Sequence, residues 1–177
     1  AFSQMGVGGK YFGLPQDTGP LVYYYNKAEF DKLGIKVPTN LDEFKAAAKT
    51  AAAQGKYISA FETDEAQFGL SAQAAAAGGV WYKAENDKWT VKIDDASAKT
   101  VADFWQSMLD DKTTFVTERW GDSFTKALTD KTLIGTIGAA WEAPLISGDL
   151  EKTDNKGEWA VAQLPDFGKG ALTGPDG

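Results

Sequence analysis

The sequence predicts an α/β layer fold, built by residues 1–177 as a single domain. Short runs rich in aromatic and β-branched residues are typical of strands. They alternate along the chain with capped amphipathic patterns that are typical of helices. Hydrophobic residues make up 43% of the 177 residues, which is ample for a hydrophobic core. No internal repeat or low-complexity tract interrupts the alternation.

Two helices early in the chain carry recognisable start and stop signals. Asn26 is suited to cap a helix over residues 26–33, with Glu29 as its capping-box partner and Gly34 as its stop. The same kind of signal introduces a second helix, which presents one apolar face to the core. This second helix is marked by Thr39 and Asp42 at its start, by Phe44, Ala47, Ala48 and Ala51 on its face, and by Gly55 at its end.

The remaining elements follow from composition and periodicity. An alanine-rich helix is expected before Gly78 and Gly79, and Pro144 suits the first turn of a later helix. The longest predicted helix has a buried stripe of Val101, Phe104, Trp105 and Met108. Strands are predicted over 10–14, 21–25, 56–61, 133–137 and 159–162, and helices over 66–77, 96–110 and 142–150 and around Phe124 and Leu128.

Residues 80–93 have the alternation of a β-hairpin, with its turn at 85–88. Trp89, Val91 and Ile93 fall on one face of it. We expect Trp89 to be a core residue, and the same holds for Phe104, Trp105 and Trp159. Trp81 and Tyr82 fit either the rim of a ligand cleft or the cover of the hairpin.

The residue inventory excludes several kinds of chemistry. The sequence has no cysteine and no histidine, which removes cysteine nucleophiles, Cys/His zinc sites and Ser-His-Asp triads. We therefore expect no metal and no cofactor. The net charge of −7 comes with no basic stripe, so no nucleic-acid partner is expected. No run of 18 apolar residues is present, so no membrane span is expected.

The segment Leu14–Val22 joins a restricted turn to a lone carboxylate. Pro15 and Pro20 fix φ, and Gly19 permits a backbone shape that other residues resist, so Asp17 should be held in a defined place. Such a segment, running into the aromatic strand that follows, is how a binding group is presented between rigid elements.

Four segments of the chain form one ordered set of motifs. They are 13–20 with Tyr25, Asn26, Lys27 and Phe30, then 34–44, then 133–141, and finally 158–165 with glycines at 168, 170 and 174. In this order they resemble the larger, C-terminal lobe of the sugar-binding solute-binding proteins that feed ABC importers. In the second segment, Leu41 stands where the family usually has tryptophan. The third resembles a family strand that ends in a glycine-proline-tryptophan corner, although this chain has Ala139, Ala140 and Trp141 there.

The resemblance implies a periplasmic-binding-protein-like lobe, an α/β fold with a mixed sheet flanked by helices. It makes residues 10–27 a hinge-adjacent segment and leaves the opposite wall of the cleft to an N-terminal lobe outside this chain. It further implies a non-catalytic receptor for a mono- or oligosaccharide. That receptor would be extracytoplasmic, in the periplasm or lipid-anchored at the cell surface, with ABC permease subunits as partners.

Five residues are the candidate ligand contacts, since a sugar needs hydrogen bonds for its hydroxyls and aromatic rings for its C–H faces. The resemblance places an acid or amide at Asp17 and an aromatic at Trp141; the alternatives are a turn aspartate and a core tryptophan. Phe68 begins the alanine-rich helix where the family often supplies a cleft aromatic. Trp120 and Asp122 form a second pair, although a helix N-cap also explains Asp122.

Two other functions compete with this interpretation. A glycoside hydrolase would need paired carboxylates across a cleft, for which Asp17 with Asp122 or Glu142 could serve. A stand-alone carbohydrate-binding module is usually a β-sandwich, which the predicted helices disfavour. A peptide, polyamine or polyol ligand also stays open.

The chain begins at Ala1 and ends at Gly177 without the look of natural termini, so we expect a piece of a longer protein.

Overall fold

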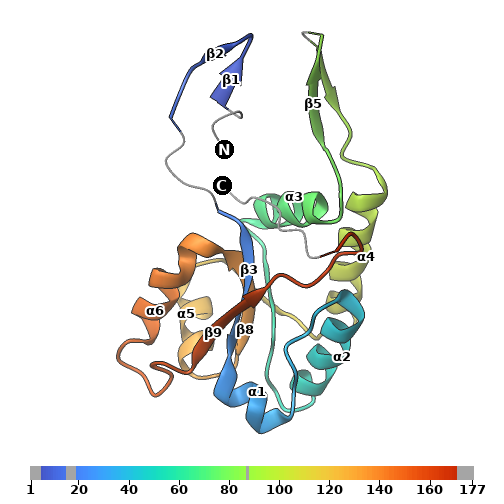
Figure 1. Ribbon diagram of the computed structural model, residues 1–177. Helices are drawn as coiled ribbons and strands as arrows, with labels where there is room; N and C mark the ends of the chain where they lie inside the picture. Colours follow the sequence, from blue (N-terminus) through green and yellow to red (C-terminus); the bar gives the residue numbers. More distant parts are fainter. Residues whose placement is uncertain (1–4, 15–18, 87, 171–177) are drawn as a thin grey trace.

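The centre of the molecule is a β-sheet (Figure 1). The computed structural model describes residues 5–14, 19–86 and 88–170. Strand β3 (Leu21–Asn26) pairs antiparallel with β8 (Gly135–Ala139) on one side and with β9 (Trp159–Gln163) on the other. The start of β3 therefore lies beside the end of β8, with Leu21 opposite Ala139.

A parallel pair of strands extends this sheet. Strand β4 (Ala60–Glu62) runs parallel to β7 (Phe115–Thr117). A parallel bridge between Tyr57 and Leu133 joins the segment before β4 to the segment before β8. Tyr57 N donates to Thr132 O and Ile134 N donates to Tyr57 O, each at 2.8 Å. The sheet is mixed, and the predicted α/β class is confirmed.

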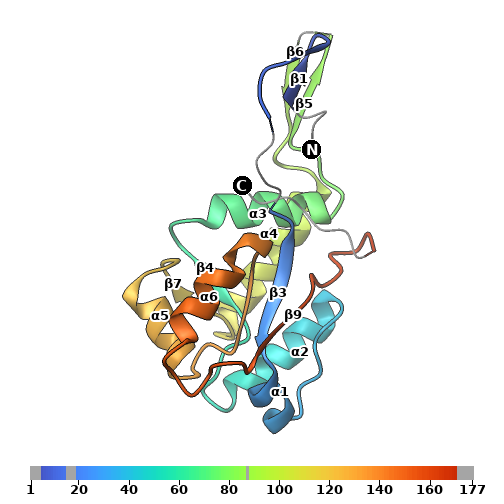
Figure 2. The same ribbon diagram turned by 60° about the vertical axis from the view of Figure 1, so that its left-hand side comes forward.

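Helices cover both faces of the sheet (Figures 1 and 2). Tyr23 belongs to the core on one face and Tyr24 to the core on the other, because successive strand residues point in opposite directions. Among the described residues, no helix combines the length and apolar character that crossing a bilayer requires. The first core packs α1 (Lys27–Leu33), α2 (Leu41–Ala52), α3 (Ala66–Ala76) and α4 (Ala96–Asp110), and the second packs α5 (Asp122–Thr129) and α6 (Ala143–Leu150).

The cap of α1 agrees with its predicted signal. The Asn26 side chain accepts from Glu29 N at 2.9 Å, and Gly34 ends the helix with φ of 66°. The Glu29 carboxylate, predicted to complete a capping box, instead pairs with Lys56 at 2.9 Å and Lys32 at 3.5 Å. That part of the prediction was wrong, because two nearby ammonium groups bind the carboxylate.

The cap of α2 lies one residue later than predicted. Asn40, rather than Thr39, accepts from Glu43 N at 2.9 Å, and the helix ends at Ala52, before Gly55. The Glu43 carboxylate returns to the Thr39 N–H and hydroxyl, both at 2.8 Å. These bonds lower the pKa of Glu43, the bond from the Thr39 N–H most. Asn40 and Glu43 thus take the places expected for Thr39 and Asp42, but Glu43 bonds the residue before the N-cap and not the N-cap N–H of a capping box.

Several predicted strands are displaced along the chain. The strand predicted at 56–61 is β4, and the one predicted at 133–137 is β8. Strand β7 was not predicted at all. Strand β8 begins at Gly135. Glycine is needed there because a Cβ would come within 3.0 Å of the Tyr23 hydroxyl and the Ile58 carbonyl. The same hydroxyl donates to Ile58 O at 2.9 Å, which fixes this close approach.

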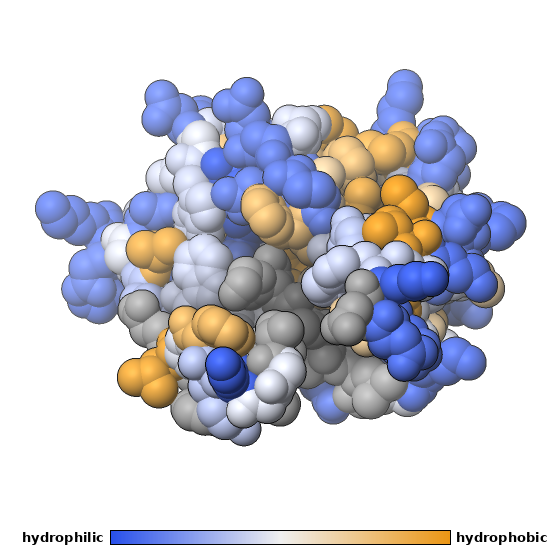
Figure 3. All heavy atoms as spheres, turned by 90° about the horizontal axis from the view of Figure 1, so that it is seen from above, coloured by the Kyte–Doolittle hydropathy of each residue, from blue (hydrophilic) through white to orange (hydrophobic). Residues whose placement is uncertain are grey.

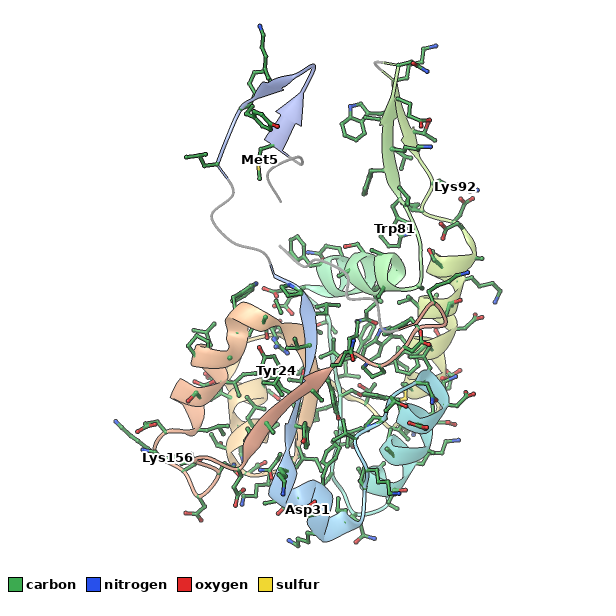
Figure 4. All side chains as sticks on the ribbon, in the orientation of Figure 1. Met5, Tyr24, Asp31, Trp81, Lys92 and Lys156 are labelled. Carbon is green, nitrogen blue, oxygen red and sulfur yellow. The ribbon has the colours of Figure 1, made fainter. Side chains whose placement is uncertain are left out.

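Two hairpins project from the body on the same side as α3 (Figure 1). They are β1 (Gly6–Val7) with β2 (Lys10–Tyr11), and β5 (Tyr82–Glu85) with β6 (Lys88–Val91). The predicted hairpin at 80–93 is confirmed. The prediction that Trp89 is a core residue was wrong, because 73% of its surface is exposed and the hairpin pairs only with itself. Trp81, at its base, packs partly buried against the core (Figure 4).

Candidate ligand-binding site

The site is defined by the sheet edge at which three strands end. Strands β4 and β7 are parallel, and the β4 segment is bridged in parallel to the β8 segment, so all three carboxyl ends face the same way. Ligands of α/β proteins commonly bind outside such carboxyl ends. Each end leads directly into a connection that carries charged or aromatic side chains.

A cavity lies at this edge, between α3 and the end of β8. Its lining mixes hydrogen-bonding groups with aromatic and aliphatic surface, which is the mixture that a sugar requires. Figure 3 views this end of the molecule from above, where hydrophobic and hydrophilic patches alternate. The lining residues are Leu21, Ala60, Phe61, Glu62, Glu65, Ala66, Phe68, Gly69, Leu70, Gln73, Trp105, Ile137, Gly138 and Glu142.

Two of the candidate aromatics are exposed at this end. Phe68 lies in the first turn of α3, lines the cavity and is 51% exposed. Trp141 lies in the 3-10 helix η2 (Ala140–Glu142) and is 43% exposed, beside the cavity residue Glu142. Neither side chain is a core residue, so both rings are available for stacking.

The other three candidates have different surroundings. The Trp120 ring packs edge-on against Phe124 at 5.5 Å between ring centroids, and it is partly buried in the second core. Asp122 is the first residue of α5, whose N-cap is Gly121, and it lines a separate hollow with Thr63. Neither residue lines the cavity that holds Phe68. Asp17 lies outside the described residues.

A buried ion cluster beneath the cavity was not predicted from the sequence. Arg119 pairs with Glu62 through Nη1 and with Glu142 through Nη2, and Nη1 also donates to Thr136 Oγ1 at 3.0 Å. The side chain of Arg119 is 1% exposed, and its Cζ lies 4.7 Å from the centroid of the Trp120 ring. One signal was available, because Arg119 is the only arginine among 18 basic residues. Arginine is the cation that suits two carboxylates in a fixed plane.

Burial and charge act against each other in this cluster. Burial raises the pKa of Glu62 to about 7, although Arg119 opposes the change; Glu65 and Asp64 add to it. Burial also lowers the pKa of Arg119, and Glu62 counteracts this. Glu142 accepts a further hydrogen bond from Ala139 N at 2.9 Å, which fixes the corner after β8.

Gly138 allows the cluster to pass beside β8. A Cβ at this position would lie within 3.0 Å of Glu142 Oε2 and of Arg119 Nη2. Only a residue without a side chain leaves room for the buried pair. Within the described ranges, no group of three or more Asp or Glu residues is placed to hold a metal ion.

Comparison with known proteins identifies the family. A family model described as bacterial extracellular solute-binding protein matches residues 1–177. The chain belongs to this family. The resemblance drawn from the four sequence segments is therefore confirmed at the level of the family.

Solved structures of solute-binding proteins share the fold of this chain. The galacto-N-biose/lacto-N-biose I-binding protein of the ABC transporter from Bifidobacterium longum, in complex with lacto-N-biose, is 52% identical. It superimposes with a TM-score of 0.92 over 99% of this chain and 44% of that one. A binding protein from B. animalis subsp. lactis Bl-04, in complex with β-1,6-galactobiose, is 26% identical. Its TM-score is 0.81, over 98% of this chain and 43% of that one.

A curated relative agrees with this assignment. A protein of Brucella abortus (strain 2308), named as a binding protein, is 28% identical over 173 residues, covering 89% of this chain. The chain spans 38% of the length of that relative and 44% of the Bifidobacterium longum protein. The periplasmic-binding-protein-like fold is confirmed for the part that this chain contains.

Proposed function

We propose that this chain is the larger, C-terminal lobe of an extracytoplasmic carbohydrate receptor that delivers its ligand to an ABC importer. The observation that carries the proposal is the cavity at the strand ends, where the exposed ring of Phe68 lies beside the polar groups of Glu62 and Gln73. The complex of the 52% identical Bifidobacterium longum protein with lacto-N-biose supports it. A β-galactosyl disaccharide is the proposed ligand class.

The proposal assigns roles to the sequence candidates. Phe68 and Trp141 stack on sugar rings, and Asp17 contacts ligand hydroxyls from the hinge-adjacent segment 10–27. An N-terminal lobe closes over the ligand by a hinge motion, and the permease subunits and the cell-surface location follow from the same receptor role. Asp122 lines the neighbouring hollow, and the Trp120 ring already has Phe124 as its partner.

Catalysis is not part of the proposal. Glu142, one of the carboxylates considered for a hydrolase, is buried and bonded to Arg119 and to Ala139 N, so it is not free to act on a glycosidic bond. The compared proteins are named for binding.

The test is calorimetry on the full-length protein with lacto-N-biose, galacto-N-biose, β-1,6-galactobiose and maltose. Saturable binding of one or more galactosyl disaccharides supports the proposal. Binding of none of them, with a correctly folded protein, refutes it. Incubation with each disaccharide followed by product analysis separates a receptor, which leaves the sugar intact, from a hydrolase.

A further inference from the structure

Glu62 is the member of the buried ion cluster that reaches the cavity most openly. Its side chain is 18% exposed, against 1% for Arg119 and 6% for Glu142. Glu62 and Glu142 both line the cavity, whereas Arg119 lies behind them. Oxygen Oε1 of Glu62 accepts from Arg119, and this bond leaves Oε2 as the oxygen through which Glu62 can meet a ligand in the cavity it lines. One oxygen of a fixed carboxyl group is therefore available in the cavity.

Arg119 holds this carboxyl group in place. Its Cζ lies 4.7 Å from the ring centroid of Trp120 and 4.5 Å from that of Phe124. Its Nη atoms donate to Glu62, Thr136 and Glu142. A guanidinium bonded in its plane and covered by rings cannot reorient, so the orientation of Glu62 is set before any ligand arrives. A preorganised polar group loses little entropy on binding.

We infer that Glu62 hydrogen-bonds a ligand hydroxyl through Oε2, and that Arg119 is the positioning residue that aims it. The inference rests on the proposed carbohydrate-binding function and adds a specific polar contact to it. In its protonated form the carboxyl group donates the proton on Oε2 to a hydroxyl oxygen of the sugar.

The charges around Glu62 favour that protonated form. One cation, Arg119, faces it from the loop after β7, while carboxylates face it from η2 (Glu142) and from the segment after β4 (Asp64 and Glu65). Tyr24 on β3 is neutral, and its hydroxyl donates to Ala139 O at 2.7 Å. A single positive charge cannot compensate all of these acidic groups, so burial keeps the pKa of Glu62 at about 7.

Ligand binding should then be linked to proton uptake. Covering the cavity removes the remaining exposure of Glu62 to water, which raises its pKa further and favours the acid form. The affinity should fall by about tenfold between about pH 6 and about pH 8, because only the protonated carboxyl group can donate. A carboxyl group whose pKa is the same with and without ligand would leave the affinity unchanged with pH.

The experiment is calorimetry of full-length protein with lacto-N-biose at about pH 6, 7 and 8, in buffers of different ionisation enthalpy. Wild type should take up a proton on binding. The variant Glu62→Gln keeps an N–H donor and should bind with an affinity that no longer depends on pH. Arg119→Lys keeps the charge but loses the planar fork, so it should shift the midpoint of the pH profile. Glu118→Gln, an exposed neighbour outside the cavity, is the control and should behave as wild type.

The outcomes distinguish the inference from the function on which it rests. If wild type binds with an affinity that does not depend on pH and takes up no proton, the role of Glu62 is overturned while the receptor function stands. A Glu62→Gln variant that keeps the wild-type pH profile overturns it equally. If wild type binds none of the disaccharides, the proposed function fails and the inference fails with it. The wild-type proton measurement needs no variant, so it decides the question even if Glu62→Gln does not fold.

Discussion

The indole Nε1 of Trp105 donates a hydrogen bond to Gln73 Oε1 at 2.7 Å, and both buried side chains form part of the cavity wall. This bond ties α4 to α3, the helix that carries Phe68. The position of the exposed aromatic ring therefore depends on a polar bond inside the core.

Replacement of Gln73 by leucine should destabilise the protein by about 1–3 kcal/mol, because it leaves the Trp105 N–H buried without an acceptor. Urea unfolding followed by circular dichroism measures the change. Gln106→Leu, on the exposed face of α4, removes only a surface bond to Asp110 and is the matched control. Equal stability of the two variants would contradict the role given to the Gln73 bond.

Gly138→Ala should cost about 1–3 kcal/mol, because the new methyl group overlaps the buried Arg119 and Glu142 contact. Gly148→Ala is the control: it lies in α6, its added Cβ meets nothing within 4 Å, and it should stabilise the helix by up to about 1 kcal/mol. Thermal unfolding should move in opposite directions for these two variants. A shift in the same direction would show that β8 has room that the structure does not provide.

Phe68→Ala and Trp141→Ala should each weaken disaccharide binding by about tenfold or more in the full-length protein, since each removes a stacking surface. Stability should change little, because both rings are largely exposed. Val161→Ala, an exposed apolar residue on β9, should leave binding unchanged. Calorimetry with lacto-N-biose compares the three variants, and full affinity in Phe68→Ala would remove that ring from the site.

The elevated pKa of Glu62 also predicts how stability without ligand depends on pH. The folded protein holds a proton that the unfolded chain releases above the ordinary value of 4.5, so this group's contribution is present below 4.5 and is lost as pH rises toward about 7. Between these two pH values, this group changes the free energy of unfolding by about 1–3 kcal/mol, and Glu62→Gln should remove that change.

Urea unfolding at several pH values measures the slope, with Glu118→Gln as the reference. Carboxylates with lowered pKa, such as Glu158 beside Lys131, act at more acidic pH and do not affect this window. Parallel stability curves for wild type and Glu62→Gln would contradict the assignment.

Local signals in the sequence were sufficient for much of the fold. The helix predicted over 96–110 is α4 with the same bounds, because a capping aspartate and a long apolar stripe act together. Strand β7 escaped prediction because three residues carry no clear period, and its identity depends on pairing with β4. Trp89 shows a related limit. Alternation indicates which residues share a face, but it does not show whether anything packs on that face.

The sequence named two aromatic residues of the candidate site, and it did not name the buried charges Glu62 and Arg119. Phe68 and Trp141 are exposed at the strand ends, in agreement with their expected availability. Glu62 and Arg119 escaped notice because arginine and glutamate are normally surface residues. Their burial depends on three segments meeting across the sheet, and no short sequence pattern encodes that meeting.

The role inferred for Glu62 would also link ligand recognition to completion of folding. Arg119 is 57 residues from Glu62 and 23 from Glu142, so an unfolded chain holds no fragment of the assembled contact. A ligand that needs this arrangement binds only the folded state, and its binding energy adds directly to the free energy of unfolding. The proposed receptor should therefore be harder for proteases to cleave while it carries its ligand.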